Sequence, residues 1–224
     1  MVRQGWRPCW RKGRVKRSSH TPRRGHILDI AANVLAERGY RDTTMLDVAK
    51  RASASKETLY AWFGDKLGLF EAVIRRNAVR VRVALNGHLD SDISVETTLT
   101  DFGRALATHL LCDNAVSINR AAIAEAHSGP ALAHSLGRVG RDPIRRAFVQ
   151  YLEQCHARGL LNVEDTDEAV DTFVGLLLGD FQTRRLLGFV DAPGEADVEG
   201  RATRAAEYFL RLYALPPLGS LRES

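Results

Sequence analysis

Few residues in this chain of 224 have the types and spacing needed for covalent chemistry. Ser53 and Lys56 form an S-x-x-K pattern, which is typical of penicillin-binding serine enzymes, but their partner patterns K-T-G and S-D-N do not occur. The seven histidines show neither H-x-x-x-H nor H-E-x-x-H spacing, the patterns of metal-binding helices. We therefore expect no enzyme activity, no metal site and no cofactor.

Residues suited to binding phosphate are concentrated in a short stretch of the sequence. Thr44, Ser55 and the pair Asp65-Lys66 stand at predicted helix starts. Free backbone N–H groups at such starts, or a cation beside them, bind phosphate. Three such starts within about twenty residues favour a nucleic-acid partner over an ordinary helical surface.

The predicted helix over 55–63 has an outer face that is polar and nearly flat. If Leu59 points inward, a periodicity of 100° per residue points Glu57 and Ala61 directly outward, with Thr58 and Tyr60 beside them. A face of this kind can approach a nucleic-acid groove closely. On periodicity alone, the pattern favours an ordinary amphipathic surface helix.

The elements that position these residues are all helical. Apolar residues recur at spacings of three and four along almost the whole chain, which predicts an all-α fold. A first helix over about 25–38 ends at Gly39, and a short second helix begins at the capping-box pair Thr44 and Asp47, with Leu46 expected inward. The four-residue connection 52–55 then leads into the third helix, and the fourth ends near Asn86-Gly87. These dimensions predict a three-helix, helix-turn-helix domain over 23–83.

The charge distribution adds a basic arm to this domain. The net charge is +5, yet the first 24 residues contain nine basic residues and no acidic one, so the remainder is net −4. We expect residues 1–22 to be a basic, disordered arm suited to a polyanion, although an inert tail or a start codon placed too far upstream gives the same pattern. The chain has no secretory h-region and no apolar run long enough to span a bilayer, so we expect a cytoplasmic protein without membrane contact.

The stretch "ILDIAANVLAERGYRDTTMLDVAKRASASKETLYAWFGDKLGLFEAVI", residues 27–74, resembles the DNA-binding domain of TetR-family transcriptional regulators. The elements "T-T", "V-A-x-x-A", "S-x-x-T-L-Y-x-x-F" and "D-K-x-x-L-F" occur in the family's order over about residues 23–83. The resemblance implies binding to an operator in double-stranded DNA, with Tyr60 and Lys66 on phosphate. The residues expected to contact DNA are Thr43, Thr44, Ser55, Lys56, Glu57, Thr58, Tyr60 and Lys66.

Two positions depart from the pattern that the resemblance implies. Family members commonly have glycine where Ser53 stands in the turn, and often where Glu57 stands in the recognition helix. A serine at a positive φ costs energy. Glu57 could accept a hydrogen bond from the amine of a cytosine in the major groove, or merely complement the helix dipole.

A C-terminal domain over 87–215 resembles, more loosely, the effector-binding and dimerisation half of the same family. Helices are expected over 95–112, 114–127, 131–158 with a break near 141–143, 166–188 and 196–213. The helix containing Phe173–Phe181 is apolar nearly all round, so we expect Gly175 and Gly179 to admit a partner helix and Phe209 to complete a homodimer seam. A helix buried inside a monomer remains the alternative.

The effector pocket is harder to place from the sequence. Its candidate residues lie on helices expected to surround the C-terminal core: Phe102, His109, Ile118, His127 and Phe148. For each residue alone, the sequence favours an ordinary core or surface position over a place in the pocket.

The resemblance implies a homodimeric regulator, expected to be a repressor that a small-molecule effector releases from a palindromic operator. One alternative is a sequence-independent nucleic-acid-binding protein that acts through its basic arm, which would show a steep salt dependence on any duplex. A second is a thiol switch at Cys112 and Cys155, two of the three widely spaced cysteines.

Overall fold

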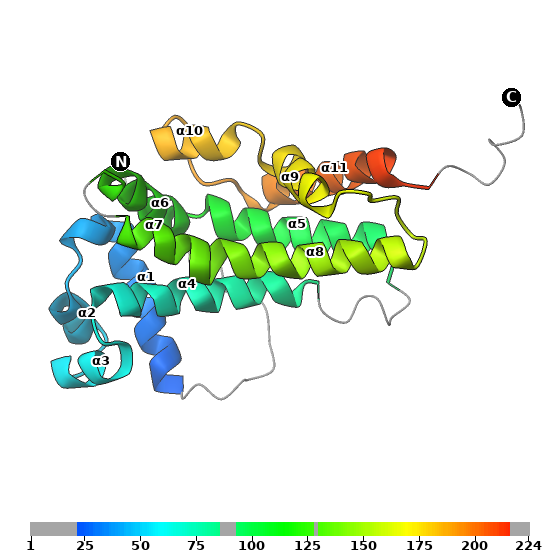
Figure 1. Cartoon of the computed structure of the whole chain (residues 1–224). Coiled ribbons are helices and arrows are strands. Elements are labelled where there is room, and N and C mark those ends of the chain that lie inside the picture. The colour runs from blue at the N-terminus through cyan, green and yellow to red at the C-terminus, as the bar shows by residue number, and fades with distance from the viewer. Residues whose placement is uncertain (1–21, 86–92, 128–129, 216–224) are drawn as a thin grey trace, which may run out of the picture.

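The computed structural model describes residues 22–85, 93–127 and 130–215, and over these residues it is helical without a strand (Figure 1). The all-α expectation is therefore confirmed. The expected basic arm, except for Pro22, and the Asn86-Gly87 boundary lie outside the described residues.

The N-terminal part begins with α1, Pro22–Asp42, which is interrupted at Gly39. Gly39 has φ 78° and ψ 170°, a backbone conformation that glycine adopts without a steric penalty. The short helices α2, Met45–Arg51, and α3, Lys56–Phe63, follow, and α4 spans Lys66–Val83. The expected interruption of the first helix at Gly39 is confirmed.

Side-chain caps fix the starts of these short helices. Thr44 and Asp47 form the capping box of α2, and Ser55 accepts a hydrogen bond from the backbone N–H of Thr58 at the start of α3. Asp65 accepts one from Gly68 at the start of α4. Leu46 was expected inward but is 47% exposed, because Met45, Val48 and Ala49 occupy the inner side of α2 instead.

The C-terminal part contains α5, Val95–Leu111, α6, Asp113–Glu125, and α7, Ala131–Ser135. A π-helical segment, Leu136–Arg141, joins α7 directly to α8, Asp142–Ala157, so the break expected near 141–143 is a change of helix type. The expected helix over 166–188 is instead two: α9, Thr166–Leu178, and α10, Phe181–Leu187. Gly179, with φ 49°, ends α9, and α11, Glu195–Tyr213, closes the bundle.

Aromatic side chains fill the centre of the C-terminal core. The rings of Phe102 and Phe148 are 4.5 Å apart, and Phe173 lies 5.1 Å from Phe148 and 5.5 Å from Phe209. Phe209 is wholly buried in this core. Its expected place in a dimer seam was therefore wrong: the apolar stripe of α11 that contains Phe209 faces the chain's own α5 and α9.

The short helices α2 and α3 lie together at one end of the molecule, beyond the bundle formed by α4, α5 and α8, whereas α9 and α11 cover the opposite side of that bundle (Figure 1). Contacts of several kinds couple the two parts. The side chain of Ile74 in α4 presses on Gly140, the hydroxyl of Ser135 donates to Glu71 at 2.6 Å, and the hydroxyl of Ser117 donates to the Leu35 carbonyl at 3.2 Å. None of the helices described has both the length and the apolar composition needed to cross a bilayer.

Candidate nucleic-acid interface and ligand cavity

The turn between α2 and α3 contains a strained residue. Ser53 has φ 50°, and it is the only non-glycine residue with a positive φ in the described part of the chain. Arg23 of α1 donates a hydrogen bond to the Ser53 carbonyl at 2.9 Å, which ties the turn to the first helix. Ser53 therefore adopts the positive φ that glycine would adopt at lower cost, and the two helices meet in helix-turn-helix geometry.

We expect Ser53→Gly to raise the free energy of unfolding by about 0.5–1 kcal/mol. Glycine removes a left-handed backbone cost of about 1–2 kcal/mol, and its greater unfolded-state entropy offsets part of that gain. Urea unfolding of both proteins measures the difference. Ser55→Ala is the matched control, because it removes a helix cap and should lower stability by about 1 kcal/mol. A Ser53→Gly protein that unfolds at lower urea would show that the turn is not strained.

The exposed face of α3 projects away from the rest of the chain. Lys56, Glu57, Tyr60 and Ala61 are exposed, while Leu59 is fully buried beneath them. The Lys56 ammonium lies 5.5 Å from the centre of the Tyr60 ring, so the two side chains share one patch. The Thr58 hydroxyl lies 2.9 Å from that of Ser55, and both therefore help to form the helix start.

The two threonines before α2 differ in accessibility. Thr44 is exposed, and its hydroxyl donates to Asp47 at 2.6 Å. This hydrogen bond is the largest cause of the lowered pKa of Asp47, with the nearby Arg38 guanidinium adding to it. Thr43 is 1% exposed, and its hydroxyl donates to the Gly39 carbonyl at 2.7 Å. The expectation that Thr43 contacts DNA is corrected, because its side chain is buried.

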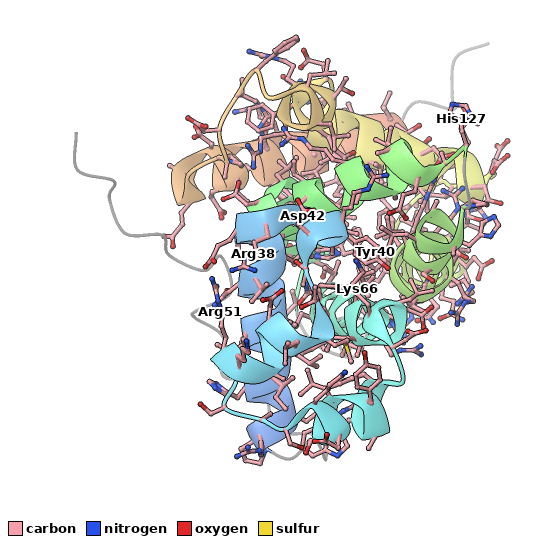
Figure 2. The ribbon with its side chains drawn as sticks, turned by 90° about the vertical axis from the view of Figure 1, so that its left-hand side faces the viewer. Arg38, Tyr40, Asp42, Arg51, Lys66 and His127 are labelled. Atoms are coloured by element: carbon pink, nitrogen blue, oxygen red, sulfur yellow. The ribbon has the colours of Figure 1, made fainter. Side chains whose placement is uncertain are left out.

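Lys66 lies beside the end of α1 (Figure 2). Its ammonium donates to the backbone carbonyls of Tyr40 at 2.9 Å and Arg41 at 3.2 Å, and it lies 4.4 Å from the centre of the Tyr40 ring. Two of its three N–H donors therefore join the end of α1 to the start of α4. Lys66 thus has a structural role that its place in a sequence motif did not reveal.

A cavity of about 630 Å³ lies between the helices of the C-terminal part and the inner side of α4. Its walls are mainly apolar, and its volume is typical of sites for small molecules. Of the residues considered from the sequence, Phe102, His109, Ile118 and Phe148 line it. His127 is exposed near the end of α6 and does not line the cavity, so its expected role in the pocket is corrected (Figure 2).

The cavity also contains a polar residue that sequence reasoning missed. Asn114 lines the cavity and is 2% exposed. Within the described residues, neither its side-chain amide nitrogen nor its oxygen has a hydrogen-bond partner. In the sequence, Asn114 stands beside Asp113 at a helix start, where a polar residue ordinarily faces solvent.

The titratable groups near the cavity are held neutral by burial. His109 is partly buried and lines the cavity, and desolvation lowers its pKa to about 4. Cys155 is buried in the core, and its pKa is raised chiefly by desolvation. Cys112 is also buried, and its thiol donates to the His109 carbonyl. Buried thiols are poor redox sensors, which argues against the thiol switch.

An apolar surface runs across α9 and α11 on the side opposite the short helices. Leu176 of α9 is 36% exposed, and Tyr208 and Leu212 of α11 are 45% and 64% exposed. Gly175 is exposed beside Leu176, and a Cβ added there would meet no atom within 4 Å. We refer to Gly175, Leu176, Tyr208 and Leu212 as the α9–α11 face.

Two protein-family models match the chain. Residues 27–73 match the family described as bacterial regulatory proteins, tetR family. Residues 97–215 match the family described as AefR-like transcriptional repressor, C-terminal domain. The first match covers the helix-turn-helix and the beginning of α4. The second covers nearly all of the part that contains the cavity and the α9–α11 face.

Individual proteins agree with these matches. A TetR transcriptional regulator from Agrobacterium tumefaciens is 34% identical in sequence and superposes with a TM-score of 0.69, covering 87% of this chain and 96% of its own. The flavonoid-responsive regulator FrrA is 26% identical, with a TM-score of 0.61 and coverage of 87% and 98%. The HTH-type transcriptional regulator YvkB of Bacillus subtilis is 26% identical over 170 residues, which are 75% of this chain and 85% of YvkB.

Proposed function

The chain belongs to the TetR family of DNA-binding transcriptional regulators, and on that premise we propose that it is a homodimeric repressor released from a palindromic operator by a small molecule. In this proposal residues 23–83 bind double-stranded DNA, and residues 87–215 bind the effector and form the dimer. The protein would act in the cytoplasm, where its operator is.

The exposure of α3 at one end of the molecule is the main support for DNA binding. Lys56, Glu57, Tyr60 and Ala61 lie on two successive turns of this helix and are exposed. The capped turn before the helix holds it at the end of the molecule. A helix presented in this way fits the major groove, where its side chains reach base edges. The third N–H of Lys66 is left to reach a phosphate beside the groove.

The α9–α11 face supports the dimer. Leucines with one third to two thirds of their surface exposed leave apolar area that a second copy would bury. A two-fold axis through this face would place two copies of α3 on the same DNA, one in each of two half-sites. The small Gly175 would allow the two copies of α9 to approach closely.

The walls of the cavity support control by an effector. Ile74 and Asn77 belong to α4, the helix that also packs against α3 and α1. Gly137 and Gly140 of the π-helical segment form another part of the wall, and Gly140 contacts Ile74 directly. A ligand that binds more tightly to one position of α4 than to another would shift the spacing of the two recognition helices.

Repression is the proposed direction of control. The C-terminal half matches the family described as AefR-like transcriptional repressor, C-terminal domain. ComR of Escherichia coli, which is 35% identical over 97 residues, is named a transcriptional repressor. FasR of Mycolicibacterium smegmatis, 39% identical over 71 residues, is an activator by name, so the direction of control requires a test of its own. Deleting the gene should raise transcription of the target gene if the protein represses it.

The alternative of sequence-independent binding is tested by competition at several salt concentrations. We propose that the full chain retains one labelled duplex in the presence of excess random competitor DNA. A protein that acted through its basic arm alone would lose that duplex to the competitor, with a steep dependence on salt.

We expect Glu57→Gln to relax the preference for one cytosine in each half-site by roughly tenfold. The carboxylate accepts a hydrogen bond from the cytosine amine, and it repels phosphate, so binding to other sequences should stay level or tighten. Binding sites selected with the two proteins give the comparison. If the two proteins select an identical consensus, Glu57 does not contact a base. Its only role is then a favourable interaction with the helix dipole in the first turn of α3.

A further inference from the structure

Asn114 is a buried amide with unmet hydrogen-bonding capacity. It stands at the second position of α6, lines the cavity and is 2% exposed. Both its Nδ2 and its Oδ1 are without a hydrogen-bond partner among the described residues. Leaving a buried donor and acceptor unpaired is unfavourable, so native proteins supply a partner to such groups. A molecule in the cavity, either a ligand or an ordered water, can supply the partner of Asn114.

The chemistry of the amide limits what that partner can be. Nδ2 donates and Oδ1 accepts, so a group that both donates and accepts can pair with each of them. A hydroxyl or a carboxamide meets this requirement. A carboxylate only accepts, and it would bring negative charge toward Oδ1, while an ammonium only donates.

The charged residues of the cavity wall are exposed or engaged in ion pairs. His109 lines the same region and is neutral at physiological pH, because burial lowers its pKa to about 4. The charged residues of the wall are Arg141, Arg145 and Asp171. Arg145 donates to Asp171 at 2.5 Å and to Asp167 at 2.8 Å, and Arg141 is exposed. These charges lie toward solvent and partly neutralise each other.

The remaining walls favour an apolar body. Phe102 and Phe148 have their ring centres 4.5 Å apart at one side of the cavity, and Ile74, Leu106 and Ile118 line it with them. Transferring apolar surface from water to such walls is favourable, whereas transferring an ion without a partner is costly. The volume of about 630 Å³ admits a molecule with several rings or a branched chain.

We propose that the cavity binds an uncharged, largely apolar molecule with one hydroxyl or carboxamide group, and that Asn114 holds this group by donating one hydrogen bond to it and accepting another. The inference rests on the proposed function, because it names the class of effector for the same site. It assigns a position to the ligand's polar group, and it excludes carboxylates and ammonium groups as the preferred ligands.

The test uses three probes that differ at one position: 4-phenylphenol, biphenyl and biphenyl-4-carboxylate. Binding of each to the full chain is measured by calorimetry without DNA, at a pH where His109 is neutral. We expect 4-phenylphenol to bind about tenfold more tightly than biphenyl, because its hydroxyl pairs with the Asn114 amide. We expect biphenyl-4-carboxylate to bind most weakly of the three. Tightest binding by the carboxylate, or no measurable binding of 4-phenylphenol, would overturn the proposal.

Asn114→Leu separates the role of the amide from that of the walls. The variant should bind 4-phenylphenol about tenfold more weakly and biphenyl at least as tightly as the native chain. It should also melt about 2–4 °C higher without ligand, since an unpaired buried amide is removed. Asn114→Ala provides the same comparison of probes if the leucine is not accommodated.

Asn119→Leu is the matched control. Asn119 lines the same cavity from the same helix, but its amide nitrogen already donates to the Ala115 carbonyl at 2.8 Å. Its replacement should leave the ratio of the phenol and biphenyl affinities within about twofold of the native value. An unchanged ratio in Asn114→Leu, or a collapse of the ratio in Asn119→Leu, would contradict the assignment.

The outcome is separable from that of the proposed function. Because the probes are measured without DNA, a wrong preference among them refutes the ligand class even if the protein still binds an operator. Failure to retain a specific duplex against competitor refutes the proposed function even if the probes bind as expected.

Discussion

Leu212→Glu is expected to prevent the proposed dimer from forming and to weaken operator binding by roughly a hundredfold to ten-thousandfold. Leu212 is 64% exposed at the C-terminal end of α11, where a second copy would cover it. A carboxylate buried without a partner in an apolar seam costs several kcal/mol, more than the seam gains from one leucine. A monomer also loses the second half-site, which the dimer holds at a high effective concentration. Sedimentation and titration of an operator duplex measure the two effects.

Val79→Glu is the matched control for this prediction. Val79 is 47% exposed on α4, away from the α9–α11 face, so its replacement introduces the same charge on another exposed apolar residue. The control should remain dimeric. If Leu212→Glu also sediments as a dimer, the α9–α11 face is not the seam.

Acidification is expected to destabilise the native chain through His109 by about 3 kcal/mol between pH 6.5 and pH 4. Burial lowers the pKa of His109 from its ordinary value of 6.5 to about 4 in the folded chain. Below pH 6.5 the unfolded chain binds a proton that the folded imidazole does not accept, so unfolding becomes more favourable as the pH falls. The loss is complete near pH 4, where the folded imidazole also protonates.

Urea unfolding of the native chain and of His109→Gln at several pH values isolates this contribution. Glutamine keeps a polar, uncharged side chain in the cavity but has no proton to gain, so the variant should lose less stability on acidification. The two proteins should differ by about 2 kcal/mol more at pH 5 than at pH 7. Parallel pH profiles would show that His109 is solvated in the folded chain.

The helix boundaries of the N-terminal part could be predicted because short-range chemistry sets them. The capping residues Thr44, Ser55 and Asp65 and the positive φ of Gly39 act within a few residues of their own position. The interruption at Gly179 was missed, since apolar residues surround it and an apolar run does not reveal a break in helix geometry. The π-helical segment likewise carries no recognisable pattern.

The orientation of side chains was harder to predict than the helices that carry them. An apolar stripe on α11 predicts burial, but it does not say whether the covering surface belongs to the same chain, which is why Phe209 was assigned to the wrong surface. Thr43 and Lys66 belong to a motif that was expected to contact DNA, yet their polar groups bond to the end of α1. Asn114 was missed because its role depends on helices distant in the sequence.

Selection of binding sites from a random duplex library with the full chain tests whether the protein recognises a specific operator. A homodimer that reads each half-site with α3 should enrich one palindromic sequence, with half-site centres about one helical turn apart or a multiple of it. Lys56→Ala combined with Tyr60→Ala should abolish the enrichment, because both side chains lie on the exposed face of α3. If selection enriches no sequence, this helix-turn-helix does not recognise a specific operator. The same conclusion follows if the double variant enriches the same sequence as strongly as the native chain.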